Sequence, residues 1–149
     1  MFNVKFFIFI LLSLFLSACS SNVSVQINNL ENSNLNNRFD DVPITVIVYQ
    51  LKDIKKFEEA SDLDLATRED GVLGKDKIDS IKLQIAPKDK VIAVKVNDEE
   101  VPYIGVLALF ANHTKKTTKI GVKTEEASGF GSNKILKFEI SKEGIKKSK

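Results

Sequence analysis

The sequence contains only one cysteine, Cys19, and one histidine, His113. A single cysteine cannot form a disulfide within the chain, and a zinc site needs several cysteine or histidine ligands. The sequence also lacks a Gly-x-Ser-x-Gly motif, which holds the nucleophile of many hydrolases. Its adjacent carboxylates, such as Glu99 and Glu100, point to opposite sides of an extended chain and make poor acid–base pairs. We therefore expect a protein that is not an enzyme, with no metal site and no catalytic residues.

An excess of charge of one sign is lacking as well, because 22 Lys and Arg side chains stand against 20 Asp and Glu side chains. Arg38 and Arg68 are the only arginines, so the sequence has no arginine cluster. This balance argues against a nucleic-acid partner. Residues 142–149 are rich in lysine, and we expect them to form a basic C-terminal tail that is frayed and solvated.

Long hydrophobic runs are also lacking. Residues 6–16 read FFIFILLSLFL, whereas a helix needs about 20 apolar residues to span a membrane. A run of this length near the N-terminus is typical of a secretory signal peptide. The sequence Leu16-Ser17-Ala18-Cys19 is similar to the lipobox of bacterial lipoproteins, in which the cysteine receives the lipid. We therefore predict a signal peptide at residues 1–18, cleavage before Cys19, and a lipidated tether at residues 19–22.

Alternating apolar and polar residues predict strands through most of the remaining chain. Residues 23–141 are long enough for one domain that buries a core without disulfides. We expect a mostly β fold, an antiparallel β-sandwich with a small helical insertion between strands 2 and 3. The seven expected strands are residues 23–28, 44–51, 81–85, 91–96, 103–110, 118–123 and 135–140.

The second strand and the insertion after it carry the clearest local signals. Residues 44–51 are apolar on both faces, so we expect both faces to be covered. A short helix is expected from Asp53, with Phe57 on its apolar face. Ser61 and Asp64 form a capping-box pattern, in which Ser61 accepts from the Asp64 amide and the Asp64 carboxylate reaches back.

The segment between the first two strands is unusually long. It covers residues 29–42 and reads NLENSNLNNRFDDV. Asparagine and aspartate favour turns over regular pairing, and loops of this length are often functional. Leu30, Leu35 and Phe39 are apolar within it, so it is more than a solubilising spacer.

The order of these features resembles the TssJ or VasD family, the outer-membrane lipoproteins of type VI secretion systems. The resemblance covers about residues 16–110. It rests on the lipobox, the Asn-rich loop and the segments PITVIVYQLKD, LG, IAP and YIGVLALF, which are residues 43–53, 73–74, 85–87 and 103–110.

The resemblance implies a transthyretin-like β-sandwich with a structural function. Members of the family hold the periplasmic domain of the IcmF-like inner-membrane protein, TssM, against the outer membrane. The resemblance therefore implies TssM as the partner, anchoring to the periplasmic face of the outer membrane by acyl chains, and no cofactor beyond the covalent lipid on Cys19. The family's contact surface corresponds to the loop between the first two strands. The residues that we expect to bind are Leu30, Leu35, Asn36, Asn37, Arg38, Phe39 and Asp40.

Three alternatives remain open. In the first, Leu35 and Phe39 fold back and cap the open end of the sandwich. In the second, the protein is a lipid-anchored carrier of a small apolar ligand, which would need a cavity where β-branched strands tend to pack solid. In the third, it is a generic envelope adhesion module of the same fold. We favour the secretion lipoprotein, with neither a nucleic acid nor a small-molecule substrate as a partner.

Overall fold

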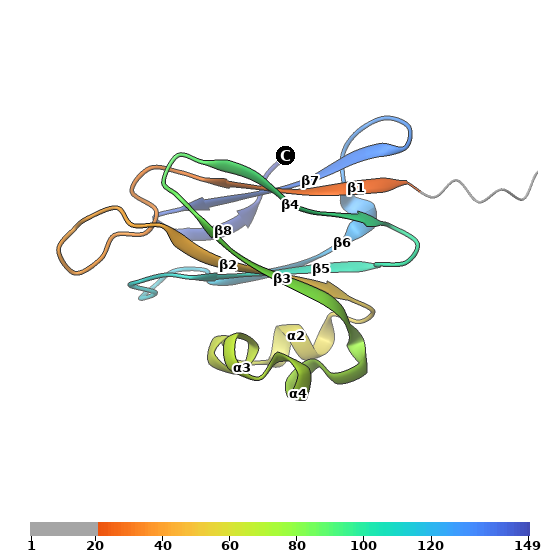
Figure 1. Ribbon diagram of the computed structural model, residues 1–149, viewed down its shortest axis with the longest axis horizontal. Coiled ribbons are helices and arrows are strands. Elements are labelled where there is room, and N and C mark those ends of the chain that lie inside the picture. Colours follow the sequence, from red (N-terminus) through yellow and green to blue (C-terminus); the bar gives the residue numbers. More distant parts are fainter. Residues whose placement is uncertain (1–20) are drawn as a thin grey trace, which may run out of the picture.

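The structure is a computed structural model that describes residues 21–149, so the predicted signal peptide and Cys19 lie outside the described residues. The described chain forms two four-stranded sheets that pack face to face (Figure 1). One sheet has the strand order β4-β1-β7-β8, and the other has the order β3-β2-β5-β6. The strands are β1 (Asn22–Asn29), β2 (Ile44–Leu51), β3 (Lys77–Ile85), β4 (Lys90–Asn97), β5 (Tyr103–Leu109), β6 (Lys119–Lys123), β7 (Asn133–Ser141) and β8 (Gly144–Lys147).

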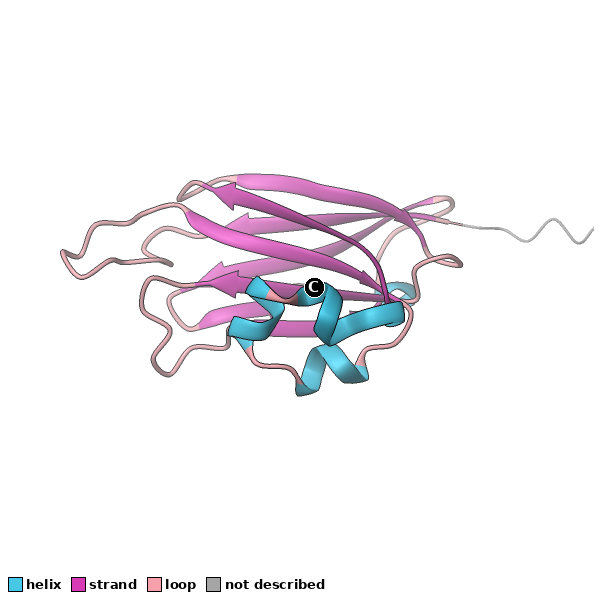
Figure 2. Cartoon of the chain, turned by 60° about the horizontal axis from the view of Figure 1, so that its bottom comes forward, coloured by secondary structure: helices cyan, strands magenta, loops and turns pink. Residues whose placement is uncertain are grey.

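Short helices separate β2 from β3 and cover the outer face of the β3-β2-β5-β6 sheet (Figure 1, Figure 2). The predicted β-sandwich with a helical insertion between strands 2 and 3 is therefore confirmed. No helix in residues 21–149 is long and apolar enough to cross a membrane. The insertion consists of α2 (Lys55–Glu59), α3 (Asp62–Thr67), α4 (Glu69–Leu73) and the 3-10 turn η1 (Gly74–Asp76). A second 3-10 turn, η2 (Thr124–Glu126), lies outside the insertion and follows β6.

Two features of the sheets differ from the prediction. The described chain has eight strands instead of seven, and β1 pairs with β7 in parallel, with Val23 opposite Lys134. The other ladders between named strands are antiparallel, as expected. Apolar–polar alternation shows which face of a strand is buried, but it is the same beside a parallel and an antiparallel neighbour. The strand direction was therefore not contained in that pattern.

The eighth strand corrects the prediction of a frayed tail at residues 142–149. Residues Gly144–Lys147 form β8, which pairs with the end of β7. Ile145 is 2% exposed and belongs to the core between the sheets. Of the two lysines that follow Ile145 in the strand, Lys146 is exposed and Lys147 is half-buried. These lysines made a short strand look like a solvated tail in the sequence.

The predicted tether at residues 19–22 is also shorter than expected, because Ser21 and Asn22 already belong to the fold. Ser21 is buried, its backbone N donates to Asp98 Oδ1 at 3.1 Å, and its hydroxyl donates to Asp98 Oδ2. Asn22 opens β1. The hydrogen bonds from Ser21 hold the pKa of the Asp98 carboxyl below its usual range.

Strand β2 is covered on both faces, as predicted. Val46 and Val48 point into the core between the two sheets. Ile47 and Tyr49 face the other way and pack under the helical insertion. The Tyr49 hydroxyl donates to the Leu65 carbonyl at 2.8 Å, and burial raises the pKa of Tyr49 above its usual value.

Phe57 of α2 fastens the insertion to the sheet. Its ring lies directly on Gly105 of β5, where a Cβ atom would come within 2.8 Å of Phe57 Cε2. The Tyr49 ring lies beside it at 5.5 Å between centroids. Lys119 of β6 donates from Nζ to the Phe57 carbonyl at 3.0 Å. This hydrogen bond pairs a carbonyl oxygen at the end of α2 that has no partner within the helix. Glycine in the middle of a strand thus marks a close approach of another element.

The helix cap at Ser61 forms only in part. Ser61 Oγ accepts from the Asp64 backbone N at 3.1 Å, as predicted. The Asp64 carboxylate does not complete a capping box, because it accepts from Arg68 Nη2 at 2.6 Å. That hydrogen bond lowers the pKa of Asp64.

Candidate functional site

The β1–β2 loop, residues 30–43, extends from the end of the sandwich opposite the start of β1 (Figure 1, orange). Because β1 has eight residues, its two ends are roughly 25 Å apart. We name the end formed by residues 30–43 and 110–118 the loop end. The opposite end, formed by residues 21–22, 98–102 and 127–132, is named the entry end.

Buried polar side chains fix the base of the loop. Asn29 and Ser33 are both 0% exposed. Asn29 Nδ2 donates to the carbonyl oxygens of Ile85 and Ala86, each at 3.1 Å, and Asn29 Oδ1 accepts from the Ser33 hydroxyl. Buried polar groups need such partners, because an unpaired one loses its hydrogen bonds to water without replacement. The start of the loop is therefore tied to the β3–β4 turn.

Asn34 ties the loop to its other neighbours. Its side chain is buried and donates from Nδ2 to the Pro43 carbonyl at 3.0 Å. Its Oδ1 accepts from the Ala111 backbone N at 2.7 Å. One amide group thus joins the two halves of the β1–β2 loop to the β5–β6 loop.

The tip of the loop is a small hairpin. Leu35 and Asp41 pair as an isolated antiparallel bridge. Between them, Asn36 Oδ1 accepts from the backbone N of Arg38 at 2.8 Å and of Asp40 at 3.0 Å. This is the way in which asparagine side chains close turns. The tip is therefore ordered by its own hydrogen bonds.

Phe39 is the most unusual residue of the tip. Its side chain is 83% exposed, and its φ is +63°. A left-handed backbone is unfavourable for a residue with a Cβ atom, and aromatic residues gain free energy by burial. Neither the backbone conformation nor packing against other residues in the range 21–149 accounts for phenylalanine at this position.

The structure brings all seven predicted binding residues into one loop, but not all of them to its surface. The side chains of Asn37, Arg38, Phe39 and Asp40 are exposed, whereas Leu30, Leu35 and Asn36 are half-buried. The alternative in which Leu35 and Phe39 both cap the sandwich is therefore wrong for Phe39, whose side chain is exposed, whereas Leu35 is half-buried. The asparagines that suggested a binding surface serve partly to build the loop.

The β5–β6 loop extends this surface, which the sequence did not indicate. Lys116 Nζ donates to the Ser33 carbonyl at 3.0 Å and lies 4.6 Å from the centroid of the Phe110 ring. Burial lowers the pKa of Lys116. The two loops therefore form one continuous surface at the loop end.

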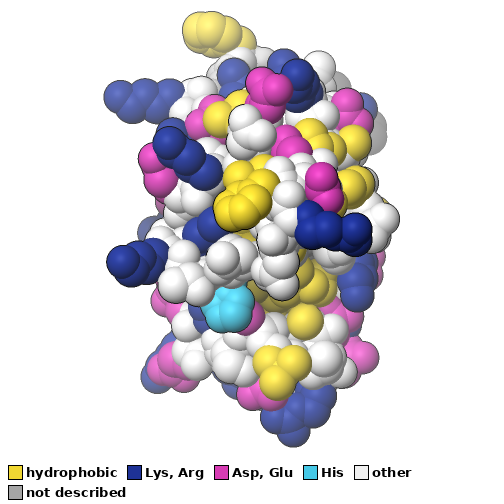
Figure 3. Space-filling view, turned by 90° about the vertical axis from the view of Figure 1, so that its left-hand side faces the viewer, with side chains coloured by type: hydrophobic (Ala, Val, Ile, Leu, Met, Phe, Trp, Pro, Cys, Tyr) yellow, Lys and Arg dark blue, Asp and Glu magenta, His cyan; other side chains and the backbone are white. Residues whose placement is uncertain are grey.

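A groove of about 460 Å³ opens beside this surface, between α3 and the end of β5. Leu63, Phe110 and His113 line it. Figure 3 looks onto the loop end and shows the histidine close to scattered hydrophobic side chains, with Lys and Arg side chains around the edge. No sequence motif links His113 to Leu63, which lies 50 positions earlier.

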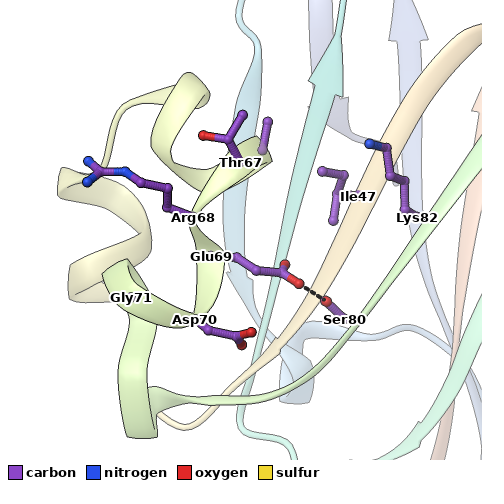
Figure 4. Close-up of a pocket in the computed structure, with 9 residues that line it drawn as sticks. Ile47, Thr67, Arg68, Glu69, Asp70, Gly71, Ser80 and Lys82 are labelled. Atoms are coloured by element: carbon purple, nitrogen blue, oxygen red, sulfur yellow. Dashed lines mark hydrogen bonds between the residues drawn. The ribbon is translucent and has the colours of Figure 1, made fainter.

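A second pocket, of about 450 Å³, lies between the α3–α4 corner and β3 (Figure 4). Both of its carboxylates already have partners. Glu69 accepts from Ser80 Oγ at 2.9 Å and from Lys77 Nζ at 3.2 Å, and Asp70 also pairs with Lys77. In the part of the chain that the structure describes, no group of three or more His, Cys, Asp or Glu residues could hold a metal ion. The exposed groups at the loop end are an aromatic ring, a guanidinium group and side-chain amides, which are suited to binding a partner and not to catalysis.

The Asn34 anchor leads to a first prediction. Asn34→Ala leaves the Ala111 N–H and the Pro43 carbonyl unpaired, so it is expected to lower the free energy of unfolding by about 2 kcal/mol. Urea denaturation followed by circular dichroism measures this change. Asn37→Ala, at an exposed position of the same loop, is the matched control and should change stability by less than about 0.5 kcal/mol. Equal effects of the two variants would show that Asn34 does not anchor the loop.

Comparison with known proteins gives the family. Residues 21–143 match the family described as "T6SS-SciN: Type VI secretion lipoprotein, VasD, EvfM, TssJ, VC_A0113". The chain belongs to this family. The match covers β1 to β7, the helical insertion and the candidate loop. It therefore extends beyond residue 110, where the sequence resemblance to the type VI secretion lipoproteins ended. No curated protein sequence matches the chain.

Solved structures show the same fold. A membrane-bound component of the type VI secretion system from Serratia marcescens, named Lip, has a TM-score of 0.76 and 20% identity, covering 87% of this chain and 97% of that chain. The lipoprotein TssJ1 from Pseudomonas aeruginosa has a TM-score of 0.73 and 17% identity, covering 87% and 95%. A chain in a structure described as "T6SS protein TssM C-terminal domain (869-1107) from EAEC" has a TM-score of 0.69 and 22% identity, covering 86% and 98%.

Proposed function

We propose that this type VI secretion lipoprotein is anchored to the periplasmic face of the outer membrane by a lipid on Cys19. We further propose that it holds the periplasmic domain of the inner-membrane protein TssM through the tip of its β1–β2 loop. Its role is structural and not catalytic. The membrane complex needs such a part because the inner-membrane protein has to be held at the second membrane.

The observation that carries this proposal is the polarity of β1. The strand starts at the entry end, three positions after Cys19, the proposed site of the lipid, and leads into the candidate loop at the opposite end (Figure 1). A lipid at the entry end therefore directs the loop away from the outer membrane and into the periplasm. This is the direction from which an inner-membrane partner approaches.

The loop tip has the composition of an interface centre. Aromatic and arginine residues are enriched among the residues that contribute most to binding, and polar groups surround them. Phe39 and Arg38 are both exposed, and the Asn36 turn holds the backbone between them in place. A tip that is ordered before binding loses less conformational entropy when the partner docks.

The comparisons support TssM as the partner. One of the matched chains comes from the structure that is described as the TssM C-terminal domain, residues 869–1107. That chain is about as long as this one, because 86% of this chain aligns with 98% of it, whereas the stated TssM segment is much longer. The occurrence of a chain of this fold in a structure described by TssM supports an association with TssM here.

Phe39→Ala tests the proposed contact. It is expected to weaken binding of the full-length lipoprotein to the periplasmic domain of TssM from the same bacterium by about 30-fold, because a central aromatic contact contributes about 2 kcal/mol. The dissociation constant is measured with both purified proteins. Since Phe39 is exposed, its removal should leave the melting temperature nearly unchanged.

Phe130→Ala is the matched control, because Phe130 is an exposed phenylalanine at the opposite end of the sandwich. It should bind the TssM domain as the wild type does. If both variants bind like the wild type, the loop tip is not the contact. If even the wild type does not bind the TssM domain, the proposed partner is wrong.

A further inference from the structure

A second exposed phenylalanine lies at the entry end. Phe130 is 98% exposed and sits at the tip of the loop before β7. Gly129 and Gly131 flank it with φ values of +141° and +69°. The base of the loop is closed by the pair Ser128 and Ile135, with N–H···O distances of 2.9 Å and 2.8 Å. The hairpin therefore presents the ring away from the body of the protein.

This loop lies beside the point where the chain enters the fold. The Asn22 backbone N donates to the Ser132 carbonyl at 2.8 Å, and Asn22 is paired with Asn133 in the parallel ladder. Ser21 is held by Asp98, so only two residue steps separate the fixed chain from Cys19. Two steps span at most about 7 Å. A lipid on Cys19 therefore brings the Phe130 loop close to the membrane surface.

We propose that the Phe130 loop, residues 128–132, contacts the phospholipid surface, with the Phe130 ring inserted among the headgroups as a second, apolar anchor. This inference rests on the proposed lipidation of Cys19 and adds a function for the entry end. The lipid holds the protein at the membrane, and the ring fixes how the sandwich stands on it. The contact thereby helps to direct Phe39 and the opposite loop into the periplasm.

The exposed carboxylates at the entry end do not supply an attraction to lipid. Glu99 and Glu100, in the β4–β5 turn at the same end, are exposed carboxylates. They do not attract anionic headgroups, so the contact has to come from the ring itself. Burying a phenylalanine side chain is worth about 1.5–3 kcal/mol, which is too little to hold a protein alone but enough to orient one that is already anchored.

The absence of tryptophan from the chain makes the test direct. Phe130→Trp and Phe39→Trp each introduce a single tryptophan at an exposed position, one at each end of the sandwich. Each full-length, processed variant is reconstituted into phosphatidylethanolamine and phosphatidylglycerol vesicles that contain brominated lipids, which quench tryptophan on contact. We expect a blue-shifted emission and severalfold stronger quenching for Phe130→Trp than for Phe39→Trp.

Other outcomes would overturn the inference. If the tryptophan at position 130 emits as in water and is quenched only by a soluble quencher, the loop does not reach the membrane. If both variants are quenched equally, the protein adsorbs without a preferred end. The mass of the N-terminal peptide reports the lipid on Cys19 separately. A chain without that lipid refutes the proposed anchoring and this inference together, whereas a lipidated chain with a solvent-exposed tryptophan refutes this inference alone.

Discussion

Phe57→Ala is expected to lower the free energy of unfolding by about 3–5 kcal/mol, the usual cost of removing a buried phenylalanine. The site cannot close over the missing ring, because the strands beneath it carry glycine at both Gly105 and Gly121. These two glycines are paired across β5 and β6 and have no side chains to move into the cavity. Urea denaturation followed by circular dichroism measures the loss.

The control for this variant is Glu58→Ala, at the next position of α2. Glu58 is exposed, so its replacement should change stability by less than about 0.5 kcal/mol. The insertion lies on the outer face of its sheet, and the core between the sheets does not depend on it. If Phe57→Ala costs no more than Glu58→Ala, the helical insertion is not fastened to the sheet by this ring.

Gly144→Ala should also be strongly destabilising, by roughly 3 kcal/mol or more, because it adds both strain and overlap. Gly144 has a φ of +120°, and a Cβ atom there would lie 2.5 Å from the Thr117 backbone N. Thr117 also accepts from the Ile145 backbone N at 2.8 Å. Relieving the overlap would therefore pull β8 away from its neighbour and uncover Ile145.

Gly131→Ala separates the cost of backbone strain from the cost of steric overlap. Gly131 also has a positive φ, +69°, but no atom lies within 4 Å of the added Cβ. Gly131→Ala should therefore lower the free energy of unfolding only by the cost of backbone strain, about 1 kcal/mol. Thermal unfolding measures both variants. Equal losses for Gly144→Ala and Gly131→Ala would mean that the contact with Thr117 can relax without cost.

The elements that the sequence predicted well are those in which local pattern and burial agree. Residues 44–51 are apolar on both faces, and the structure covers them with a second sheet on one side and helices on the other. Phe57 marked the face of α2 that packs on the sheet. These predictions succeeded because the periodicity of a segment reports its own environment directly.

The elements that were missed depend on residues far apart in the sequence. The four residues of β8 carry two lysines, and the strand is held by the neighbouring β7 on one side and by Thr117, 28 positions before Ile145, on the other. In the candidate loop, the sequence predicted a long segment rich in asparagine but not the structural role of each asparagine. Asn34 binds Ala111, 77 positions away, whereas Asn37 is exposed. Propensity treats these two residues alike, and only the three-dimensional contacts distinguish an anchor from a surface residue.

The position of β1 in its sheet has a mechanical consequence. Tension applied between Ser21 and Leu30 runs along β1, which has β4 on one side and β7 on the other. The hydrogen bonds to both neighbours lie across the strand, so the load is shared by all of them in shear. A strand at the edge of a sheet, pulled from one end, would instead peel away one bond at a time. If the chain is anchored at Cys19 and bound through the β1–β2 loop, as proposed, the pulling force thus runs through a strand that is paired on both sides.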